Sequence, residues 1–114
     1  MLKVFSENLV SDLNDSSIFS STMGNKVFPI LAGADNSFPL TTYRITENRG
    51  VTKDATAGSI ELMFWFAKEH YDECVEFTDA MVLYLKSKYR FISSTVDISE
   101  DTMNYNGIIN LEKI

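Results

Sequence analysis

The sequence contains few of the residues from which catalytic and metal sites are built. Its 114 residues include one cysteine, Cys74, so no intramolecular disulfide can form. Its one histidine, His70, stands at the start of a predicted helix, where a capping or surface role is the simplest interpretation. Cys74 falls on the apolar stripe of the same helix, so we expect a buried, unreactive thiol. We therefore predict no catalytic residue, no cofactor and no enzymatic activity.

Positive charge and long apolar runs are also scarce. Ten Lys and Arg residues are scattered among sixteen Asp and Glu residues, giving a net charge of −6 and a pI of about 4.6. Because phosphate binding needs clustered cations, we expect no sequence-specific binding of nucleic acid. The longest apolar run, Leu62–Ala67, is far too short to cross a membrane, and the N-terminus lacks the apolar core of a signal peptide. We therefore expect a soluble protein that is intracellular at synthesis.

Carboxylates are plentiful, but they form no recognisable site. Pairs such as Asp72 and Glu76 fall on exposed helix positions, whereas hydrolytic pairs usually lie far apart in sequence and meet in a cleft. Asp97, Glu100 and Asp101 are conceivable metal ligands, but their spacing does not match an EF-hand loop. The glycines form no phosphate-binding motif. We therefore interpret these carboxylates as solvated charge and predict no metal site.

What the sequence does contain is 45% hydrophobic residues in periodic patterns. A chain of this size can build its own core, so we predict a single domain over residues 1–114. Helical spacing of apolar residues predicts a helix from Leu2 to Leu13 and a stronger one from Tyr71 to Tyr89. The apolar stripe of the second helix comprises Tyr71, Val75, Thr78, Val82, Leu85 and Tyr89, with Cys74 and Met81 beside it.

Alternating β-branched and aromatic residues predict five strands. In the clearest, Phe64 lies on one face with Ile60, Leu62 and Phe66, while Met63 and Trp65 lie on the other. These two outer side chains must be covered by this chain or by another subunit. The predicted strands are Val27–Ala32, Leu40–Thr46, Ser59–Ala67 and two shorter ones that contain Val96–Ile98 and Ile109–Leu111.

The order of these elements predicts the fold class. We expect the last two strands to form a hairpin closed by Asn106-Gly107, a strong type I′ turn signal. Pro29 lacks the N–H that a sheet ladder needs, so the first strand should lie at a sheet edge or be broken there. The order is α-β-β-β-α-β-β. It predicts an α+β fold, a mostly antiparallel sheet of four to five strands with two helices packed on one face.

Several segments, taken in order, resemble the tail-terminator or tail-completion proteins of long-tailed bacteriophages and prophages, which join heads to tails. In that family a Pro-Leu-x-x-Tyr strand, a polar loop, an aromatic strand, a helix opening Tyr-Asp-Glu-Ala and a closing hairpin follow one another. Here Pro39-Leu40 and Tyr43 match the first motif, and Tyr71-Asp72-Glu73 match the helix start, with Cys74 in place of the usual small residue. Between them lie a polar loop, Glu47–Gly58, and the aromatic strand Ile60–Ala67.

The resemblance implies a non-enzymatic role in virion assembly. Such proteins close the end of the tail tube as a ring, commonly of six subunits, and present a surface to the head connector. The implied partners are copies of this chain, the tail tube and head-connector proteins. The implied location is the bacterial cytoplasm during assembly and then the head–tail junction of the virion. A ring needs a heterologous interface, and our candidates for it are Arg49, Lys53, Asp54, Met63 and Trp65.

Other interpretations remain open at this point. The five candidates can equally belong to a mobile loop and to a sheet face that helices cover. The whole chain can be a small adaptor domain that binds a protein or peptide partner at a sheet edge. Pro29 would then guard one edge, and the C-terminal strand could offer the other. Concentration-dependent ring formation would favour the first function, and a monomer with a peptide partner would favour the second.

Overall fold

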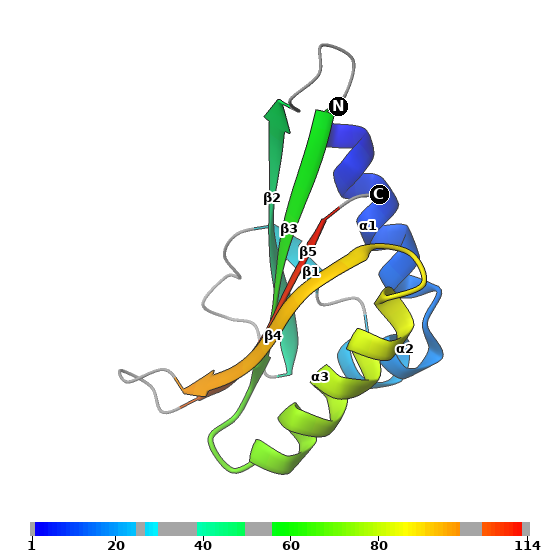
Figure 1. Ribbon diagram of the computed structural model, residues 1–114. Helices are drawn as coiled ribbons and strands as arrows, with labels where there is room; N and C mark the ends of the chain where they lie inside the picture. Colours follow the sequence, from blue (N-terminus) through cyan, green and yellow to red (C-terminus); the bar gives the residue numbers. More distant parts are fainter. Residues whose placement is uncertain (1, 25–26, 30–38, 50–55, 99–103, 113–114) are drawn as a thin grey trace.

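Five strands form one sheet, and the helices lie together on one side of it (Figure 1). The computed structural model describes residues 2–24, 27–29, 39–49, 56–98 and 104–112. None of the helices within these ranges is long and apolar enough to cross a membrane. In chain order the elements are α1 (Leu2–Asn14), α2 (Ser17–Met23), β1 (Val27–Pro29), β2 (Leu40–Arg49), β3 (Thr56–Phe66), α3 (Tyr71–Leu85), β4 (Arg90–Ile98) and β5 (Tyr105–Glu112).

The strands are arranged in the order β1-β2-β3-β5-β4. β1 runs parallel to β2, and all the other neighbouring strands are antiparallel. This confirms the predicted α+β class with a mostly antiparallel sheet. Pro29 lies in an edge strand, as its missing N–H predicted. The C-terminal strand β5 lies inside the sheet, so the prediction that it offers a free edge is wrong; β4 is at that edge.

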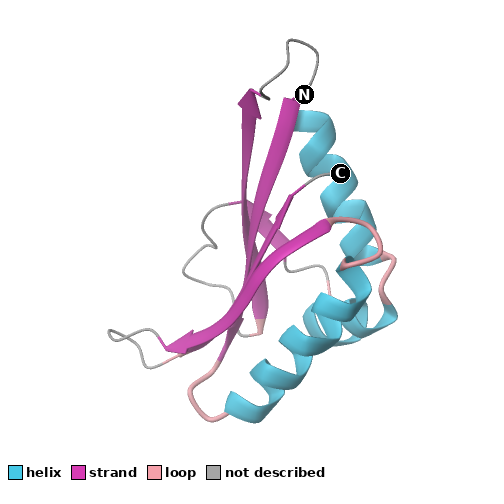
Figure 2. Cartoon of the chain, viewed as in Figure 1, coloured by secondary structure: helices cyan, strands magenta, loops and turns pink. Residues whose placement is uncertain are grey.

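The core lies between the sheet and the helices (Figure 2). Alternation along β3 turns Ile60, Leu62, Phe64 and Phe66 toward the helices, and all four are buried. The ring of Phe64 meets that of Phe77 in α3 edge to face, with centroids 4.9 Å apart. The predicted core face of this strand is therefore confirmed. Burying Phe64 completely stabilises the fold by roughly 1.5–3 kcal/mol.

Helix α1 is amphipathic, as its spacing predicted, and it buries Leu9 and Leu13 against the rest of the core. Its long-range hydrogen bonds include one to β2 and one to α3. The hydroxyl groups of Ser6 and Tyr43 lie 2.7 Å apart, which connects the helix to β2. The hydroxyl of Tyr84 donates to the backbone oxygen of Asp12 at 2.6 Å, which connects it to α3.

A third helix, α2, lies in a stretch for which the sequence predicted no element. Ser16 caps it, because its hydroxyl accepts a hydrogen bond of 3.3 Å from the N–H of Phe19. Gly24 follows its last residue at φ +60°, in the left-handed region that glycine tolerates best. Phe19 and Met23 are fully buried and explain why the helix forms. Seven residues, mostly Ser and Thr, are too few to show a helical period.

The predicted turn at Asn106-Gly107 is wrong, because both residues lie inside β5. Gly107 is opposite Phe64 in the neighbouring strand and faces α3. A methyl group added at Gly107 would overlap the side-chain hydroxyl of Thr78. The glycine is therefore needed for a close approach of helix and sheet, and not for a turn.

Two further boundaries differ from the sequence prediction. Half of the expected polar loop Glu47–Gly58 is strand, because β2 continues to Arg49 and β3 begins at Thr56. Pairing with a neighbouring strand overrides the polar composition of these ends. Helix α3 ends at Leu85, and Tyr89 follows the helix instead of extending its stripe. The buried stripe is also turned away from Tyr71, which is half exposed; it consists of Cys74, Phe77, Thr78, Met81 and Leu85.

Candidate subunit interface

The sheet face turned away from the helices, here called the outer face, carries two of the five predicted interface residues. Met63 lies between Thr42 of β2 and Ile108 of β5 in the strand register, and Trp65 lies between Leu40 and Asn106. Met63, Trp65 and Ile108 are partly buried. Their placement on the face opposite Phe64 is as the alternation predicted. Apolar side chains therefore predominate at this end of the outer face, here called its apolar end, although Thr42 and Asn106 beside them are polar.

The indole of Trp65 has a fixed partner within the chain. Its Nε1–H donates a hydrogen bond of 3.0 Å to the hydroxyl oxygen of Thr42. The N–H is the only hydrogen-bonding group of a tryptophan side chain. The part of Trp65 that remains accessible is therefore aromatic carbon, which is the kind of surface that protein interfaces favour at their centre.

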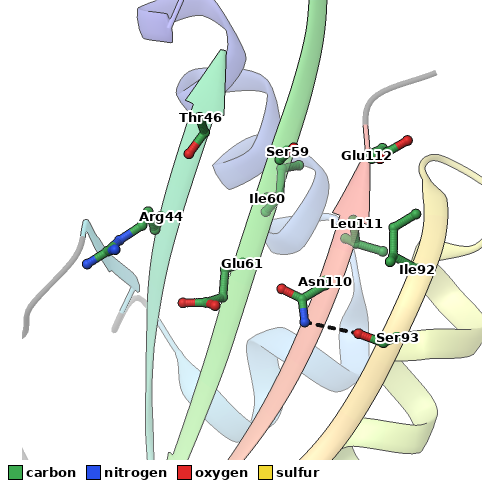
Figure 3. Close-up of a pocket in the computed structure, with 10 residues that line it drawn as sticks. All are labelled: Arg44, Thr46, Ser59, Ile60, Glu61, Ile92, Ser93, Asn110, Leu111 and Glu112. Atoms are coloured by element: carbon green, nitrogen blue, oxygen red, sulfur yellow. Dashed lines mark hydrogen bonds between the residues drawn. The ribbon is translucent and has the colours of Figure 1, made fainter. Parts of the chain in front are cut away.

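A shallow hollow of about 380 Å³ occupies the other end of the outer face (Figure 3). Side chains from β2, β3, β5 and β4 line it, and they include charges of both signs, such as Arg44 and Glu61. At its floor the Nδ2 of Asn110 donates a hydrogen bond of 3.0 Å to the Ser93 hydroxyl. The complete lining is Arg44, Thr46, Ser59, Ile60, Glu61, Ile92, Ser93, Asn110, Leu111 and Glu112.

No pattern in the sequence indicates that Ile92 belongs to this hollow. The register of β4 against β5 shifts between Phe91 and Ser93, so Ile92 is the extra residue of a β-bulge. Its side chain is 48% exposed at the rim of the hollow. Alternation along β4 alone cannot predict a bulge, because the bulge depends on how β5 pairs with it.

Of the other predicted interface residues, only Arg49 has a described position, and it lies away from Met63 and Trp65. Arg49 ends β2 opposite Thr56, whereas Met63 pairs with Thr42, seven residues earlier in β2. At about 3.3 Å per residue, Arg49 and Met63 are about 23 Å apart along the ribbon. Lys53 and Asp54 lie outside the described residues. Arg49 therefore lies toward the opposite end of the β2–β3 ribbon from Met63 and Trp65, and the role of all five candidates in an interface stays a prediction.

Cys74 and His70 behave as ordinary structural residues. Cys74 is fully buried, and burial raises the pKa of its thiol, an effect that the side chain of Thr78 opposes more weakly. His70 precedes α3 without capping it through its side chain, and its Nδ1 lies 3.0 Å from Glu73 Oε1 on the surface. The buried thiol and the surface histidine were both predicted; a capping role for the imidazole is not seen.

Metal-ligating side chains do not cluster within the described ranges. No three residues of the His, Cys, Asp and Glu types come together there in a way that could hold an ion. Of the three conceivable ligands in the sequence, Asp97 is exposed near the end of β4, while Glu100 and Asp101 lie outside the described residues.

Comparison with known proteins identifies the fold. The sequence matches no protein-family model and no curated protein. The structure is similar to a chain of a solved structure described as "Virion of native gene transfer agent (GTA) particle". The TM-score is 0.66, and the alignment covers 90% of this chain and 87% of that chain at 6% sequence identity. The two chains therefore share a fold along nearly their whole length.

Proposed function

We propose that this chain is a structural protein of a phage-like virion and, within that class, a tail terminator. It closes the end of the tail tube as a ring and joins the tube to the head connector. One observation carries the proposal, the similarity of nearly the whole fold to a chain of a gene transfer agent virion. The sequence motifs around Pro39-Leu40, Tyr43 and Tyr71 support it, because they suggested the same class of protein independently of the fold.

The two-layer architecture supports assembly through surfaces of different kinds. The helices cover one side of the sheet, and on the other side Met63 and Trp65 are only partly buried, so part of each side chain can contact a neighbour. A ring requires that one patch of each subunit meets a different patch of the next. The apolar end of the outer face is suited to the centre of such a contact, and the charged residues around Arg44 and Glu61 to its rim.

A role in assembly is also consistent with the settings of Cys74 and His70, neither of which is arranged for catalysis. A buried thiol of raised pKa at Cys74 is unreactive, and His70 is bonded to Glu73 on the surface. We therefore propose a non-catalytic protein. Its net charge of −6 would be multiplied in a ring, so DNA that passes through the channel would slide past without being held. The proposed partners are the tail tube and the head connector. The chain would bind them in the bacterial cytoplasm during assembly and remain at the head–tail junction of the virion.

The test locates the chain in particles. A producing strain receives an epitope tag on the chain, and purified particles are examined by immunogold electron microscopy, with the untagged parent strain as the control. We expect one label per particle at the junction of head and tail. Deletion of the gene should leave heads and tails separate. Supplying the untagged chain in trans should restore joined particles. Label along the tail, label on the head shell or joined particles in the deletion strain would contradict the proposal.

The second candidate function is an adaptor domain that binds an extended peptide. The observation that favours it is the edge strand β4, which is nine residues long and pairs only with β5 among the described residues. Addition of a strand to such an edge is a common mode of peptide recognition. A tagged chain that is absent from particles but captures an extended segment of another protein would favour this function over the first.

A further inference from the structure

The two edges of the sheet differ in their capacity to pair with another strand. β1 has three residues, and one of them is Pro29, which has no N–H to donate. β4 has nine residues, of which seven are exposed. Within the described part of the chain no strand lies beyond β4. No described strand therefore pairs with its outward backbone N–H and C=O groups, which an added strand could use.

β4 also lacks the residues that commonly protect a free edge. Lysine and proline are the usual guards, and neither occurs between Arg90 and Ile98. The exposed side chains include Ile92 at 48% and Ile98 at 38%, which favour contact with other apolar side chains. Two structural features do restrict the edge. The bulge at Ile92 bends it, and the carboxylate of Asp97 accepts a hydrogen bond from the N–H of Ile98 at 2.8 Å.

We propose that the β4 edge pairs with the β4 edge of a second copy of this chain. The two strands run antiparallel about a twofold axis at Ser94, so that each Ser94 faces its counterpart. The inference does not rest on the proposed function, because a twofold contact joins two identical patches and cannot by itself close a larger ring. It adds a second contact surface, separate from the apolar end of the outer face.

This register matches the faces of the two sheets on both sides of the axis. Thr95 of one copy pairs with Ser93 of the other, and both residues lie on the outer face, opposite Ile108 and Asn110 of β5. Val96 pairs with Phe91 of the second copy, and both lie on the helix side. Ile92 is the extra residue of the bulge, so it is passed over in this ladder as it is in the ladder with β5.

The same register brings opposite charges together. One step beyond Val96 and Phe91, Asp97 of one copy faces Arg90 of the other, and the symmetry produces this pair twice. Both side chains project from the outer face. Arg90 is free to move, because its side chain is 72% exposed and lies 3.9 Å from Glu112, a loose ion pair. Asp97 uses Oδ1 for the N–H of Ile98, which leaves Oδ2 for the guanidinium. A second copy of the chain is therefore the occupant whose charge and face pattern fit this edge.

Sedimentation of the free protein tests the pairing. We expect the 12.9 kDa chain to reach a mass of twice that value as its concentration rises. Arg90→Asp should raise the dimer Kd about tenfold or more, because two pairs of like charges then face each other. Arg90→Asp combined with Asp97→Arg should restore the original Kd, since the two charges change places and opposite charges face each other again. Ser94→Asp should raise the Kd, because two carboxylates meet at the axis, while Ser11→Asp on the exposed side of α1 is the matched control.

Each outcome decides the inference. A dimer whose Kd responds to Arg90→Asp and Ser94→Asp, and recovers in the exchanged variant, supports it. A chain that stays monomeric at all concentrations overturns it. A dimer whose Kd is unchanged by all three substitutions overturns it as well. Binding of extended peptides to a monomeric chain at β4 also overturns it, in favour of the adaptor function. Failure here leaves the location of the chain at the head–tail junction untouched, because that is measured in particles.

Discussion

The hydroxyl of Tyr89 donates a hydrogen bond of 2.6 Å to Oδ2 of Asp12, across 77 positions of the sequence. Tyr89 is buried just before β4 begins, and Asp12 lies near the end of α1. The Nζ of Lys88 lies 4.0 Å from the other carboxylate oxygen, and the Tyr84 hydroxyl donates to the backbone of Asp12. One residue of α1 thus contacts three side chains, Tyr84 from the end of α3 and Lys88 and Tyr89 from the segment that joins α3 to β4.

Asp12→Ala should lower the free energy of unfolding by about 1–3 kcal/mol, because the buried Tyr89 hydroxyl loses its acceptor. Asp12→Asn should lower it less, since an amide oxygen can still accept the bond. Asp15→Ala is the control, because Asp15 is exposed at the end of the same helix. Urea unfolding followed by circular dichroism measures all three variants. Equal losses for Asp12→Ala and Asp15→Ala would show that the contact contributes nothing.

The stability of the fold should decrease in alkali through Tyr89. Burial, and then the hydrogen bond and the negative charge of Asp12, raise the pKa of Tyr89 well above its usual value. An unfolded tyrosine loses its proton near pH 10. Above that pH the unfolded state is deprotonated while the folded state still holds the proton, so the stabilisation is full below about pH 10 and is lost as pH rises further. Tyr89→Phe should flatten this decline in unfolding experiments between about pH 9 and 11, and an unchanged slope would contradict the assignment.

Gly107→Ala should destabilise the protein by about 1–3 kcal/mol, because its methyl group would overlap the hydroxyl of Thr78 and force α3 away from β5. Thr78→Ala removes that hydroxyl, together with its bond to the backbone oxygen of Cys74. The double variant should therefore lose less than the two single losses added together. A double-mutant cycle by chemical denaturation checks this coupling, and strictly additive losses would mean that the two residues do not compete for the same space.

Phe64→Ala should destabilise the fold by roughly 3–5 kcal/mol, since it empties a fully buried site beside Phe77. Trp65→Ala, one position later, should have the smaller effect. Its ring is only partly buried on the outer face, and the substitution removes its hydrogen bond to Thr42 without emptying a site in the core. The two variants are each other's control in equilibrium unfolding. A larger penalty for Trp65 would show that the alternation of β3 is out of register.

Arg49→Glu together with Lys53→Glu should prevent tail completion while leaving thermal unfolding of the free chain unchanged. The reason is the predicted role of both cations in pairs between ring subunits. Exposed pairs contribute only about 0–1 kcal/mol each, but reversal turns attraction into repulsion at every contact of the ring. Lys68→Glu together with Lys86→Glu is the control, because both residues are exposed at the two ends of α3. Normal tails from the first double variant would remove Arg49 and Lys53 from the interface.

The outer-face candidates show how far pattern reasoning reaches in this chain. Strict alternation placed Met63 and Trp65 opposite Phe64, because a strand must turn successive side chains to opposite faces. Alternation could not show that Arg49 lies about 23 Å from Met63 along the ribbon, since that depends on where β2 and β3 stop pairing. The polar composition of Glu47–Gly58 predicted a loop, but backbone pairing extended the strands into it.

Elements whose signal is local and repeated could be predicted from the sequence. The spacing of Leu9 and Leu13 specifies α1, the acidic first turn and apolar positions specify α3, and the β-branched runs specify most of the sheet. These signals are readable because one face of each element must be apolar wherever the core lies. The missing N–H of Pro29 likewise confines its strand to an edge in any sheet.

The remaining features depend on contacts between distant parts of the chain. Asn106-Gly107 carries a turn signal, yet Gly107 stands in a strand because Thr78 of α3 leaves no room for a side chain there. Helix α2 forms because its few apolar residues, Phe19 among them, fill a space that the sheet and α3 create. β5 takes the interior place and β4 the edge, since β5 has buried residues on both of its faces and β4 is mostly exposed. Each of these features depends on a neighbour that is distant in sequence. Local propensities amount to less than about 1 kcal/mol per residue, so tertiary contacts override them.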